Sequence, residues 1–559
     1  MRKINTNRIL SGCILTILLI LYSCGGKSYK SGDSLADRQE KDKAAIEFIR
    51  NTVNSQSGKV AVAGKEITLC QPVLLNNLYD KFGYNLLWSK EQNWNFPADS
   101  VFQFFDKSAF YGLFPEDYHQ RELTAIRKQF ADDSLYKKER KDPLLWGAAD
   151  ILFTDAFIQL VHDISLGRLP NDSISLNKDS LITADFLLKQ ANLLKDSGSI
   201  YELVHTLEPA HCGYIELKKG IEKFLKKASF FEFTQIPPKG NPGYKRALQK
   251  RLFEGGYIAF DSVEADSVQL AAAVKQFQQD NGLTVDGRAG DATIRMMNLS
   301  DREKFIRIAI SMDKYKKLPE RMPDRYIWVN TSSNYLDVVD KGKVQFRSKV
   351  ICGKPYTRTP LLNGSISQLI TYPQWVPPPS IVSKEILPAV KKNPGYLTKK
   401  GFSLLDKEGN EVDPYSVDWT KFSKGVPYRI VQGSGDANAL GILKFHFDNK
   451  YSVYLHDTNQ RYLFANAMRS LSHGCVRVQE WERLALYILD SDRQSGGRPA
   501  TDSLKKWLKN KEKHHITVRN KVPVFIRYIT CEGVGGDIVF YDDVYGDDKM
   551  IRQKYFASK

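Results

Sequence analysis

The feature that most constrains this chain is a short motif, Ser472-His473-Gly474-Cys475, which follows a strand-like segment and precedes a helix-like one. Residues 451–456 alternate between apolar and polar side chains, as a half-buried strand does, and this segment ends at His456. Apolar side chains then recur at helical spacing between residues 478 and 488. We therefore predict that Cys475 lies in a tight turn shortly before a helix, whose N-terminal end would favour a thiolate.

The residue types of this motif suit acyl transfer by a cysteine. A thiolate is a strong nucleophile, and an imidazole such as that of His456 can take the thiol proton and hold it for the leaving group. Gly474 would let the backbone approach a substrate carbonyl closely, and its N–H and that of Cys475 could donate to the developing oxyanion. An isolated cysteine is more often a small buried side chain, but this combination of one cysteine, two histidines and a glycine favours catalysis.

At these residues the chain resembles the L,D-transpeptidases of peptidoglycan assembly, whose signature is a histidine followed, after a spacer, by Ser/Thr-His-Gly-Cys. Here 15 residues separate His456 from Ser472. The flanking stretches Tyr-Leu-His-Asp-Thr at 454–458 and Cys-Val-Arg-Val at 475–478 are similar to those of the long periplasmic members. Arg477 stands where many members have asparagine, and arginine is a common variant at that place.

The resemblance implies a mechanism that uses no metal or other cofactor. Cys475 would attack the carbonyl of the third residue of a tetrapeptide stem and expel the terminal D-alanine, while His456 accepts and later returns the proton. A backbone carbonyl of residue 457 or 472 would orient the imidazole, and His473 would shape the oxyanion hole. The thioester would then pass to an amine of another stem, which gives a 3→3 cross-link. Members of the family are also acylated by carbapenems.

Four side chains around the motif are candidate contacts for the peptidoglycan stem peptide. Arg477 could bind a substrate carboxylate, or it could form a structural ion pair. Trp375 and Tyr454 could be aromatic walls for the stem, or they could belong to the core. Ser472 of the motif completes the set.

The resemblance extends over three consecutive parts, so we predict a multidomain α+β fold. Apolar residues recur at helical spacing from 44 to 237, and Tyr111-Gly112-Leu113 is similar to a phrase in the helical scaffold domain of the long members. Residues 242–299 predict two amphipathic helices, a glycine turn and a third helix near Asp291. This pattern closely resembles a small three-helix peptidoglycan-binding module, although such a module can also serve only for packing.

Residues 324–545 predict a mostly-β catalytic domain. Segments 326–330, 335–339 and 344–350 alternate as strands do, and 522–528 and 537–541 are predicted strands that could pair as a hairpin. The insertion at 376–437 is rich in proline, glycine and lysine, and so long an excursion from a compact sheet is more often functional. Because the matching segment caps the substrate cleft in the long relatives, we expect a capping lid, the alternative being a plain surface excursion.

The first residues determine the predicted compartment. Basic residues precede a short apolar run, and Leu-Tyr-Ser-Cys at 21–24 resembles a bacterial lipoprotein cleavage box. We therefore predict a signal peptide over 1–23, lipidation of Cys24 and a tether over 24–43, the alternative being a plain signal peptide or an uncleaved anchor. Gly25 lacks the acidic character that retains lipoproteins in the inner membrane. This favours the cell envelope as the location, on the periplasmic side of the outer membrane.

Charge, cysteines and histidines limit the other possibilities. The formal net charge of +17 suits an anionic partner such as the cell wall, but the basic residues are spread too thinly to predict nucleic-acid binding. The five cysteines after Cys24 are scattered and suggest no disulfide framework. We also assign no metal site, because the histidines at 119, 162, 205 and 211 lack a metal-like arrangement in the sequence.

Two other functions remain open. A hydrolytic relative would give the same thioester to water and act as an L,D-carboxypeptidase or an endopeptidase. A non-catalytic lipoprotein would instead use residues 242–299 to anchor the wall to the membrane. The presence of Cys475 together with His456 and His473 favours an enzyme.

Overall fold

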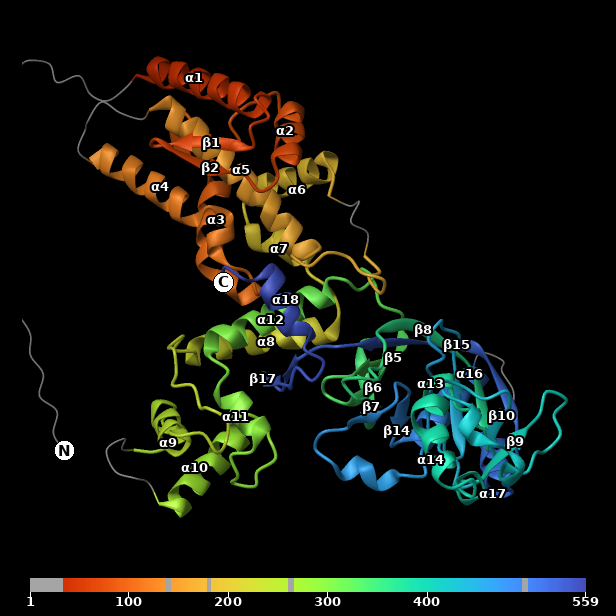
Figure 1. Ribbon diagram of the computed structural model, residues 1–559. Coiled ribbons are helices and arrows are strands. Elements are labelled where there is room, and N and C mark those ends of the chain that lie inside the picture. Colours follow the sequence, from red (N-terminus) through yellow and green to blue (C-terminus); the bar gives the residue numbers. More distant parts are fainter. Residues whose placement is uncertain (1–33, 136–141, 178–181, 260–265, 495–500) are drawn as a thin grey trace, which may run out of the picture.

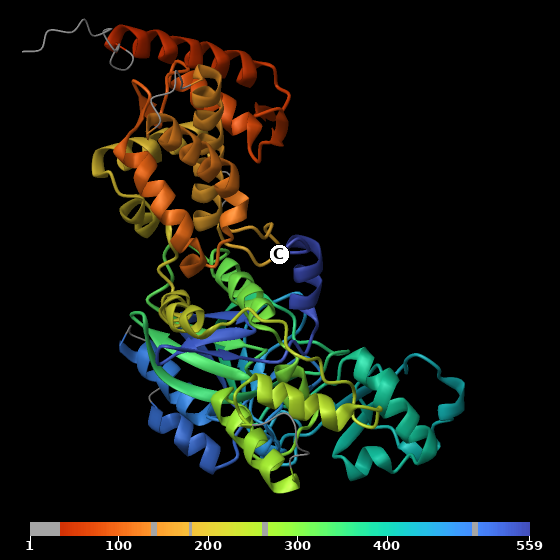
Figure 2. The ribbon, with the colours of Figure 1, turned by 90° about the vertical axis from the view of Figure 1, so that its left-hand side faces the viewer.

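The computed structural model describes residues 34–135, 142–177, 182–259, 266–494 and 501–559. The predicted signal peptide, Cys24 and the first part of the tether lie outside the described residues. Figure 1 shows a helical domain at the top, a small helical module at the lower left and a β-rich domain at the lower right. In the orthogonal view of Figure 2, the helical domain still stands at one end of the molecule.

The helical domain is built around α5 (Pro143–Ser165), whose first turn carries a proline and whose N-terminus is capped by Asp142. By length and composition α5 is the one described helix that could cross a membrane, but 89% of its most apolar window is buried. Such burial is typical of the central helix of a folded domain. The other elements of this domain are α1 (Leu35–Asn54), β1 (Lys59–Val62), β2 (Lys65–Thr68), α2 (Pro72–Lys81), β3 (Ser89–Lys90), β4 (Asn93–Trp94), α3 (Phe96–Lys107), η1 (Ser108–Tyr111), η2 (Pro115–Tyr118), α4 (Gln120–Leu135), α6 (Ala184–Ser197) and α7 (Ile200–Leu207).

The small module consists of three helices, as predicted: α9 (Tyr244–Glu254), α10 (Ser267–Asp280) and α11 (Asp291–Met297). The buried side chain of Gln278 organises the turn that joins the last two helices. Its Oε1 accepts the N–H groups of Asp286 and Gly287, and its Nε2 donates to the carbonyl of Arg288. Gly287 adopts a positive φ of 73°, which a glycine tolerates without strain.

The bodies meet at a helical junction made of α8 (Cys212–Lys227), α12 (Asp301–Tyr315) and α18 (Asp547–Tyr555). Tyr214 of α8 and Ile308 of α12 lie in one buried cluster with Phe525 from the β-rich domain. Beside this junction, β16 (Cys531–Val534) and β17 (Asp537–Phe540) form a separate hairpin.

The predicted hairpin of 522–528 with 537–541 is therefore wrong. Residues Gly535 and Gly536 both have positive φ, 58° and 81°, so they form a two-residue turn between β16 and β17. Strand 522–528 belongs instead to β15 (His515–Arg527), which pairs with β5 and β8 of the main sheet.

The β-rich domain is a nine-stranded sheet in the order β13-β7-β14-β12-β11-β8-β15-β5-β6. An additional pairing of β6 with β7 closes the sheet on itself. Helices α16 (Trp481–Gln494) and α17 (Thr501–Lys509) pack beside it. The remaining strands are β5 (Arg325–Asn330), β6 (Tyr335–Asp340), β7 (Lys343–Gly353), β8 (Leu362–Thr371), β11 (Leu443–His446), β12 (Leu455–His456), β13 (Ser470–Ser472) and β14 (Val476–Val478), so the strands predicted at 326–350 are confirmed.

The insertion between β8 and β11 forms a compact unit with its own core. Leu387, Leu397 and Trp419 are among the buried side chains of this core, and the unit lies against one side of the sheet domain (Figures 1 and 2). Its elements are α13 (Pro379–Ile381), η4 (Val382–Ile386), α14 (Leu387–Lys392), α15 (Tyr396–Lys399), β9 (Phe402–Leu405), η5 (Pro414–Ser416), η6 (Trp419–Lys421) and β10 (Arg429–Gln432).

Candidate active site

The register of two short parallel strands brings Cys475 and His456 together. In this pairing Leu455 lies beside Val476, and His456 lies beside Arg477. Leu455 and Val476 are fully buried in the core, so Cys475 and His456 lie on the opposite face of the strands. From ordinary strand spacing, the Cα atoms of the cysteine and the histidine are then about 8 Å apart.

Strand β14 separates Cys475 from the predicted helix, so the inclusion of Val478 in the helical spacing is wrong. Val476 and Val478 are β-branched, alternate with Arg477 and pair with β12 and β7. Helix α16 begins only at Trp481. The helix N-terminus therefore cannot supply the stabilisation of the thiolate that the helical spacing suggested, because the dipole effect falls off within one turn.

The turn before the thiol depends on Gly474. Its φ of 118° lies in the region that favours glycine, and a Cβ atom there would lie 3.3 Å from the carbonyl oxygen of Arg358. The Ser472 hydroxyl donates to the carbonyl of Cys475 and accepts the N–H of Gly474. The Gly474 N–H predicted to face an oxyanion is thus bound within the turn, and Ser472 holds the turn together.

The surroundings of Cys475 have opposing effects on the pKa of its thiol. Burial raises its pKa, whereas hydrogen bonds from Tyr454 and the positive charges of Lys444 and Arg477 lower it. Lys444 lies directly opposite His456 on β11, and its Nζ is 3.9 Å from the centre of the Tyr454 ring. Sequence reasoning missed Lys444: its alternation with Leu443 and Phe445 puts it on the polar face of its own strand, but only the pairing of β11 with β12 places that face beside His456.

His456 is buried and held in one orientation. Its Nδ1 forms a hydrogen bond with the carbonyl of Asp457, so one of the two carbonyls predicted to orient the ring is confirmed as a contact. The carbonyl of Ser472 is instead occupied by the N–H of Lys354 and the hydroxyl of Thr357. Burial, together with the nearby Arg477, lowers the pKa of His456 to about 3. The imidazole is therefore neutral at neutral pH.

A buried carboxylate stabilises the segment that carries this carbonyl. Both oxygens of Asp457 accept hydrogen bonds from the guanidinium of Arg461, and one also accepts the N–H of Ile442. Gly441 leaves room for it, because a Cβ there would lie 2.3 Å from the Asp457 carboxylate. The side chain after the histidine thus secures the loop, while its backbone contacts the imidazole.

Arg477 makes no ion pair among the described residues. It donates to the Gln460 side chain over 2.8 Å and to the Thr458 hydroxyl over 3.4 Å, and burial lowers its pKa. The structural ion pair considered from the sequence is therefore not what holds it. A guanidinium with neutral partners keeps its charge available to an anion.

The insertion reaches the motif at two points. The ring nitrogen Nε2 of His473 contacts the carboxylate of Glu385 in η4, a partner that the sequence did not suggest. Trp375 is half-buried and hydrogen-bonds through its side chain to Tyr454, which in turn contacts the thiol. The structure thus brings the predicted Tyr454 to the thiol and Trp375 to Tyr454, and it directs His473 toward the insertion.

Outside this site, one histidine lies close to other possible metal ligands. His119 lies with Cys70 and Asp155 in a group of side chains that could hold a metal ion, an arrangement that the sequence did not indicate. The three residues are far apart in sequence, which is why no spacing motif indicated the group.

Comparisons with known proteins agree with the architecture. Residues 324–495 match the family model described as L,D-transpeptidase catalytic domain, 73–221 match the scaffold domain, and 245–297 match a model described as "Putative peptidoglycan binding domain". A Haemophilus influenzae protein named "Putative L,D-transpeptidase" is 36% identical over 225 residues. That match covers 40% of this chain and 45% of the relative, so the chain spans less than half the length of the relative it matches.

Two solved structures also match parts of the chain. The Ldtfm–avibactam carbamoyl enzyme is 14% identical, covers 38% of this chain and 51% of its own, and has a TM-score of 0.16. An L,D-transpeptidase from Stackebrandtia nassauensis is 17% identical, covers 51% and 90%, and has a TM-score of 0.18. The three family models alone assign residues 324–495 to an L,D-transpeptidase catalytic domain, which a scaffold domain and a domain described as a "putative peptidoglycan binding domain" precede.

Proposed function

We propose that this protein is an L,D-transpeptidase that forms 3→3 cross-links in peptidoglycan through a thioester on Cys475. The observation that carries the proposal is the register of β12 with β14. In this register Cys475 and His456 lie on one face of the paired strands, with their Cα atoms about 8 Å apart. The matched catalytic and peptidoglycan-binding domains support peptidoglycan as the substrate.

In the first step, the neutral imidazole takes the thiol proton as the sulfur attacks. Nδ1 of His456 binds the Asp457 carbonyl and so carries the ring proton, which makes Nε2 the nitrogen that would accept the proton of Cys475. The sulfur bonds to the carbonyl carbon of the third stem residue, and the carbonyl becomes an oxyanion. When the peptide C–N bond breaks, the imidazolium returns the proton to the departing D-alanine amine.

The nearby cations stabilise only one of the two charged groups that form in this step. Lys444 and Arg477 favour the thiolate but disfavour a protonated His456. The pair therefore rests as thiol and imidazole, and charge separates only as the bond to substrate forms. With the Gly474 N–H bound to Ser472, the N–H of Cys475 is the backbone donor that we assign to the oxyanion.

In the second step, an amine of another stem attacks the thioester. His456 takes the proton of the incoming amine and returns it to the sulfur as the C–S bond breaks, so Cys475 is regenerated. Transfer to water in place of the amine would give a carboxypeptidase. Incubation with purified tetrapeptide stems separates the two, since a transpeptidase releases a cross-linked dimer and a hydrolase releases free tripeptide.

The insertion at 376–437 acts as the capping lid in this proposal. Its Glu385 contacts His473 of the motif, and Trp375 at its base contacts Tyr454 beside the thiol. The lid would close over the bound stem, Trp375 and Tyr454 would line its path, and Arg477 would bind its carboxylate. Excision of residues 384–432 tests this role, because unchanged turnover and stem affinity would contradict it.

The place of action follows from the N-terminal sequence and the wall-binding domain. We propose that Cys24 carries a lipid, that 24–43 is the tether, and that the chain faces the periplasm from the outer membrane. The domain boundaries proposed from the sequence, 44–237, 242–299 and 324–545, complete this arrangement. Mass spectrometry of the N-terminal peptide from cells tests the lipid, and an unmodified Cys24 would contradict it.

The direct test of the enzymatic proposal compares two thiols of the same chain. Cys475→Ser should abolish dimer formation from stem peptides, whereas Cys212→Ser, a half-buried thiol in α8, should leave it unchanged. Muropeptides of cells that carry the Cys475 variant should lack the 3→3 dimers that the wild-type chain forms. Persistence of those dimers would contradict the proposal.

A further inference from the structure

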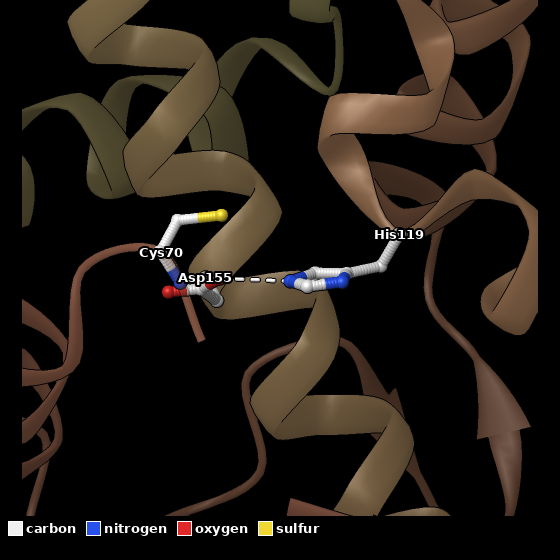
Figure 3. A group of neighbouring side chains, drawn as sticks. All are labelled: Cys70, His119 and Asp155. Carbon is white, nitrogen blue, oxygen red and sulfur yellow. Dashed lines mark hydrogen bonds and ion pairs between the residues drawn. The ribbon is translucent and has the colours of Figure 1, made fainter. Parts of the chain in front are cut away.

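Three side chains of the helical domain lie close to one another (Figure 3). Cys70 comes from the segment between β2 and α2, His119 from the residue between η2 and α4, and Asp155 from the middle of α5. One possible ligand atom from each residue lies within 4.8 Å of the other two. We propose that Cys70, His119 and Asp155 bind a divalent cation of the zinc class, which joins three segments of the helical domain.

The carboxylate at the centre of this group is already held in place. Asp155 is fully buried, and its oxygens accept the N–H groups of Cys70 over 2.8 Å and of Gln71 over 2.9 Å. The Nε2 atom of His119 lies 2.8 Å from one of these oxygens, along the dashed line in Figure 3. Such backbone contacts preorganise a ligand, since the carboxylate needs no rearrangement to face the thiol and the imidazole.

The donor types fit zinc better than the hard cations. Zinc binds thiolate, imidazole and carboxylate in tetrahedral sites, whereas calcium and magnesium prefer oxygen ligands. Donor atoms around tetrahedral zinc are about 3.4 Å apart. The His119 nitrogen and the Asp155 oxygen would therefore need to separate by roughly half an ångström, a small movement for side chains.

The proposed site is open to solvent on the side of Cys70 only. His119 and Asp155 are buried, whereas Cys70 is exposed. A cation held by all three would thus have protein on one side and solvent beyond Cys70, where a water molecule can complete four-coordination. The proposed site can be loaded from solution without unfolding the domain.

Protons balance simply when the cation binds. Partial burial and the charge of Asp155 raise the pKa of the Cys70 thiol to about 12, so without a cation the sulfur keeps its proton. On binding, the thiol loses that proton to solvent and forms a sulfur–metal bond. The imidazole of His119 then carries its ring proton on Nδ1 and binds the cation through Nε2. No oxidant or reductant is needed.

Titration of the full chain with Co²⁺ and Zn²⁺ tests the site. The metal-free protein should bind one equivalent of Co²⁺ with a thiolate-to-metal charge-transfer absorption, and Zn²⁺ should displace it and raise Tm. Cys70→Ser should remove the absorption and weaken Zn²⁺ binding at least about 100-fold. The matched control is Cys212→Ser, which removes a thiol outside the group and should keep both signals.

Cys70→Ser is the decisive variant because Cys70 is exposed and its backbone contacts survive the substitution. Asp155→Asn is less suitable, since Asp155 also holds two backbone N–H groups. His119→Gln provides a second test, with the same loss of Zn²⁺ affinity expected. Equal Zn²⁺ affinity in wild type, Cys70→Ser and His119→Gln, or no binding to the wild type, would overturn the proposal and leave the group as a hydrogen-bonded contact only.

Discussion

Two cysteine–histidine groups of the described residues, Cys475 with His456 and Cys70 with His119, differ in the sign of the neighbouring charge. At Cys475 the nearby charges are the cations Lys444 and Arg477, which counter the effect of burial on the thiol pKa. At Cys70 the largest nearby charge is the carboxylate of Asp155, which adds to the effect of burial. The first thiol can become an anion during a reaction, whereas the second keeps its proton unless a cation replaces it.

The difference shows that residue type alone does not assign a role to a cysteine beside a histidine. His456 contacts a neutral backbone carbonyl, while His119 contacts a carboxylate. The first arrangement leaves a neutral imidazole that can accept a proton, and the second brings together ligand types that suit a metal. If the two environments differ in this way, substitutions at Cys475 and His456 should affect catalysis, and the corresponding substitutions at Cys70 and His119 should not.

The largest expected effect is on catalysis. Cys475→Ala should lower the rate of dimer formation at least about 10⁴-fold because it removes the nucleophile. Cys70→Ser should leave that rate within about twofold, since its thiol does not touch the catalytic strands. Initial rates with purified stem peptides measure both. Comparable losses in the two variants would remove the distinction between the sites.

The second effect concerns the base. His456→Gln should lower kcat/KM about 10²–10⁴-fold, because a glutamine side chain cannot accept the thiol proton. His119→Gln in the helical domain is the matched control and should retain the wild-type rate. A loss in the control equal to that in His456→Gln would indicate that the helical domain takes part in the chemistry.

The third effect is on stability at acid pH. Burial lowers the pKa of His456 to about 3 from its ordinary value of 6.5, so the unfolded chain binds more protons than the folded one between these values. The contribution of His456 to the free energy of unfolding is therefore fully present above pH 6.5 and is lost as pH falls toward 3. Urea unfolding should show a steeper loss of stability in the wild type than in His456→Gln, by up to a few kcal/mol at pH 4. If the free energy of unfolding fell equally with pH in both proteins, His456 would not be a buried, neutral imidazole in the folded chain.

The fourth effect concerns the turn. Gly474→Ala should destabilise the chain by about 1–3 kcal/mol, because its φ is positive and the carbonyl of Arg358 crowds the added methyl group. Gly425→Ala is the control, since nothing lies within 4 Å of a Cβ at that position and its φ is ordinary. Thermal unfolding of both variants measures the difference. Equal Tm values would show that the turn relaxes without cost.

The smallest effect is at the lid contact. Glu385→Gln should raise KM less than about fivefold and change kcat little, because a partly exposed contact between a carboxylate and an imidazole contributes under about 1 kcal/mol. Glu408→Gln, an exposed position of the same insertion, should leave KM unchanged. If His473→Gln abolished the effect of Glu385→Gln in the double variant, the contact itself would be responsible. Additive effects would argue against it.

Much of the architecture follows from local patterns. The strands at 326–350 and the three helices of the small module are predictable because their periodicity and turn residues agree with the final fold. Val478 is different, since its spacing also fits the helix that follows, and only pairing with β7 decides that it is a strand residue. Strand β17 pairs with β16 and not with 522–528, because the glycine pair before it forms a tight hairpin turn that the strand-like alternation alone does not reveal.

The candidate pair Cys475 and His456 is predictable because both belong to one signature that spans residues 456–475, whereas Lys444 and Glu385 are not predictable in this way. Lys444 and Glu385 reach the motif from another strand and from the insertion, so only the folded chain brings them there. Cys70 and Asp155 are 85 residues apart, and no sequence pattern joins them. Contacts of this kind depend on tertiary packing, which the periodicity of apolar residues in the sequence does not reveal.

The most direct test of the account is the position of the acyl group. The full chain is treated with a carbapenem, digested, and analysed by mass spectrometry, together with Cys475→Ala and Cys70→Ser. The account predicts one adduct on the peptide that contains Cys475 in the wild type and in Cys70→Ser, and none in Cys475→Ala. An adduct that persists in Cys475→Ala, or one found on the Cys70 peptide, would contradict it.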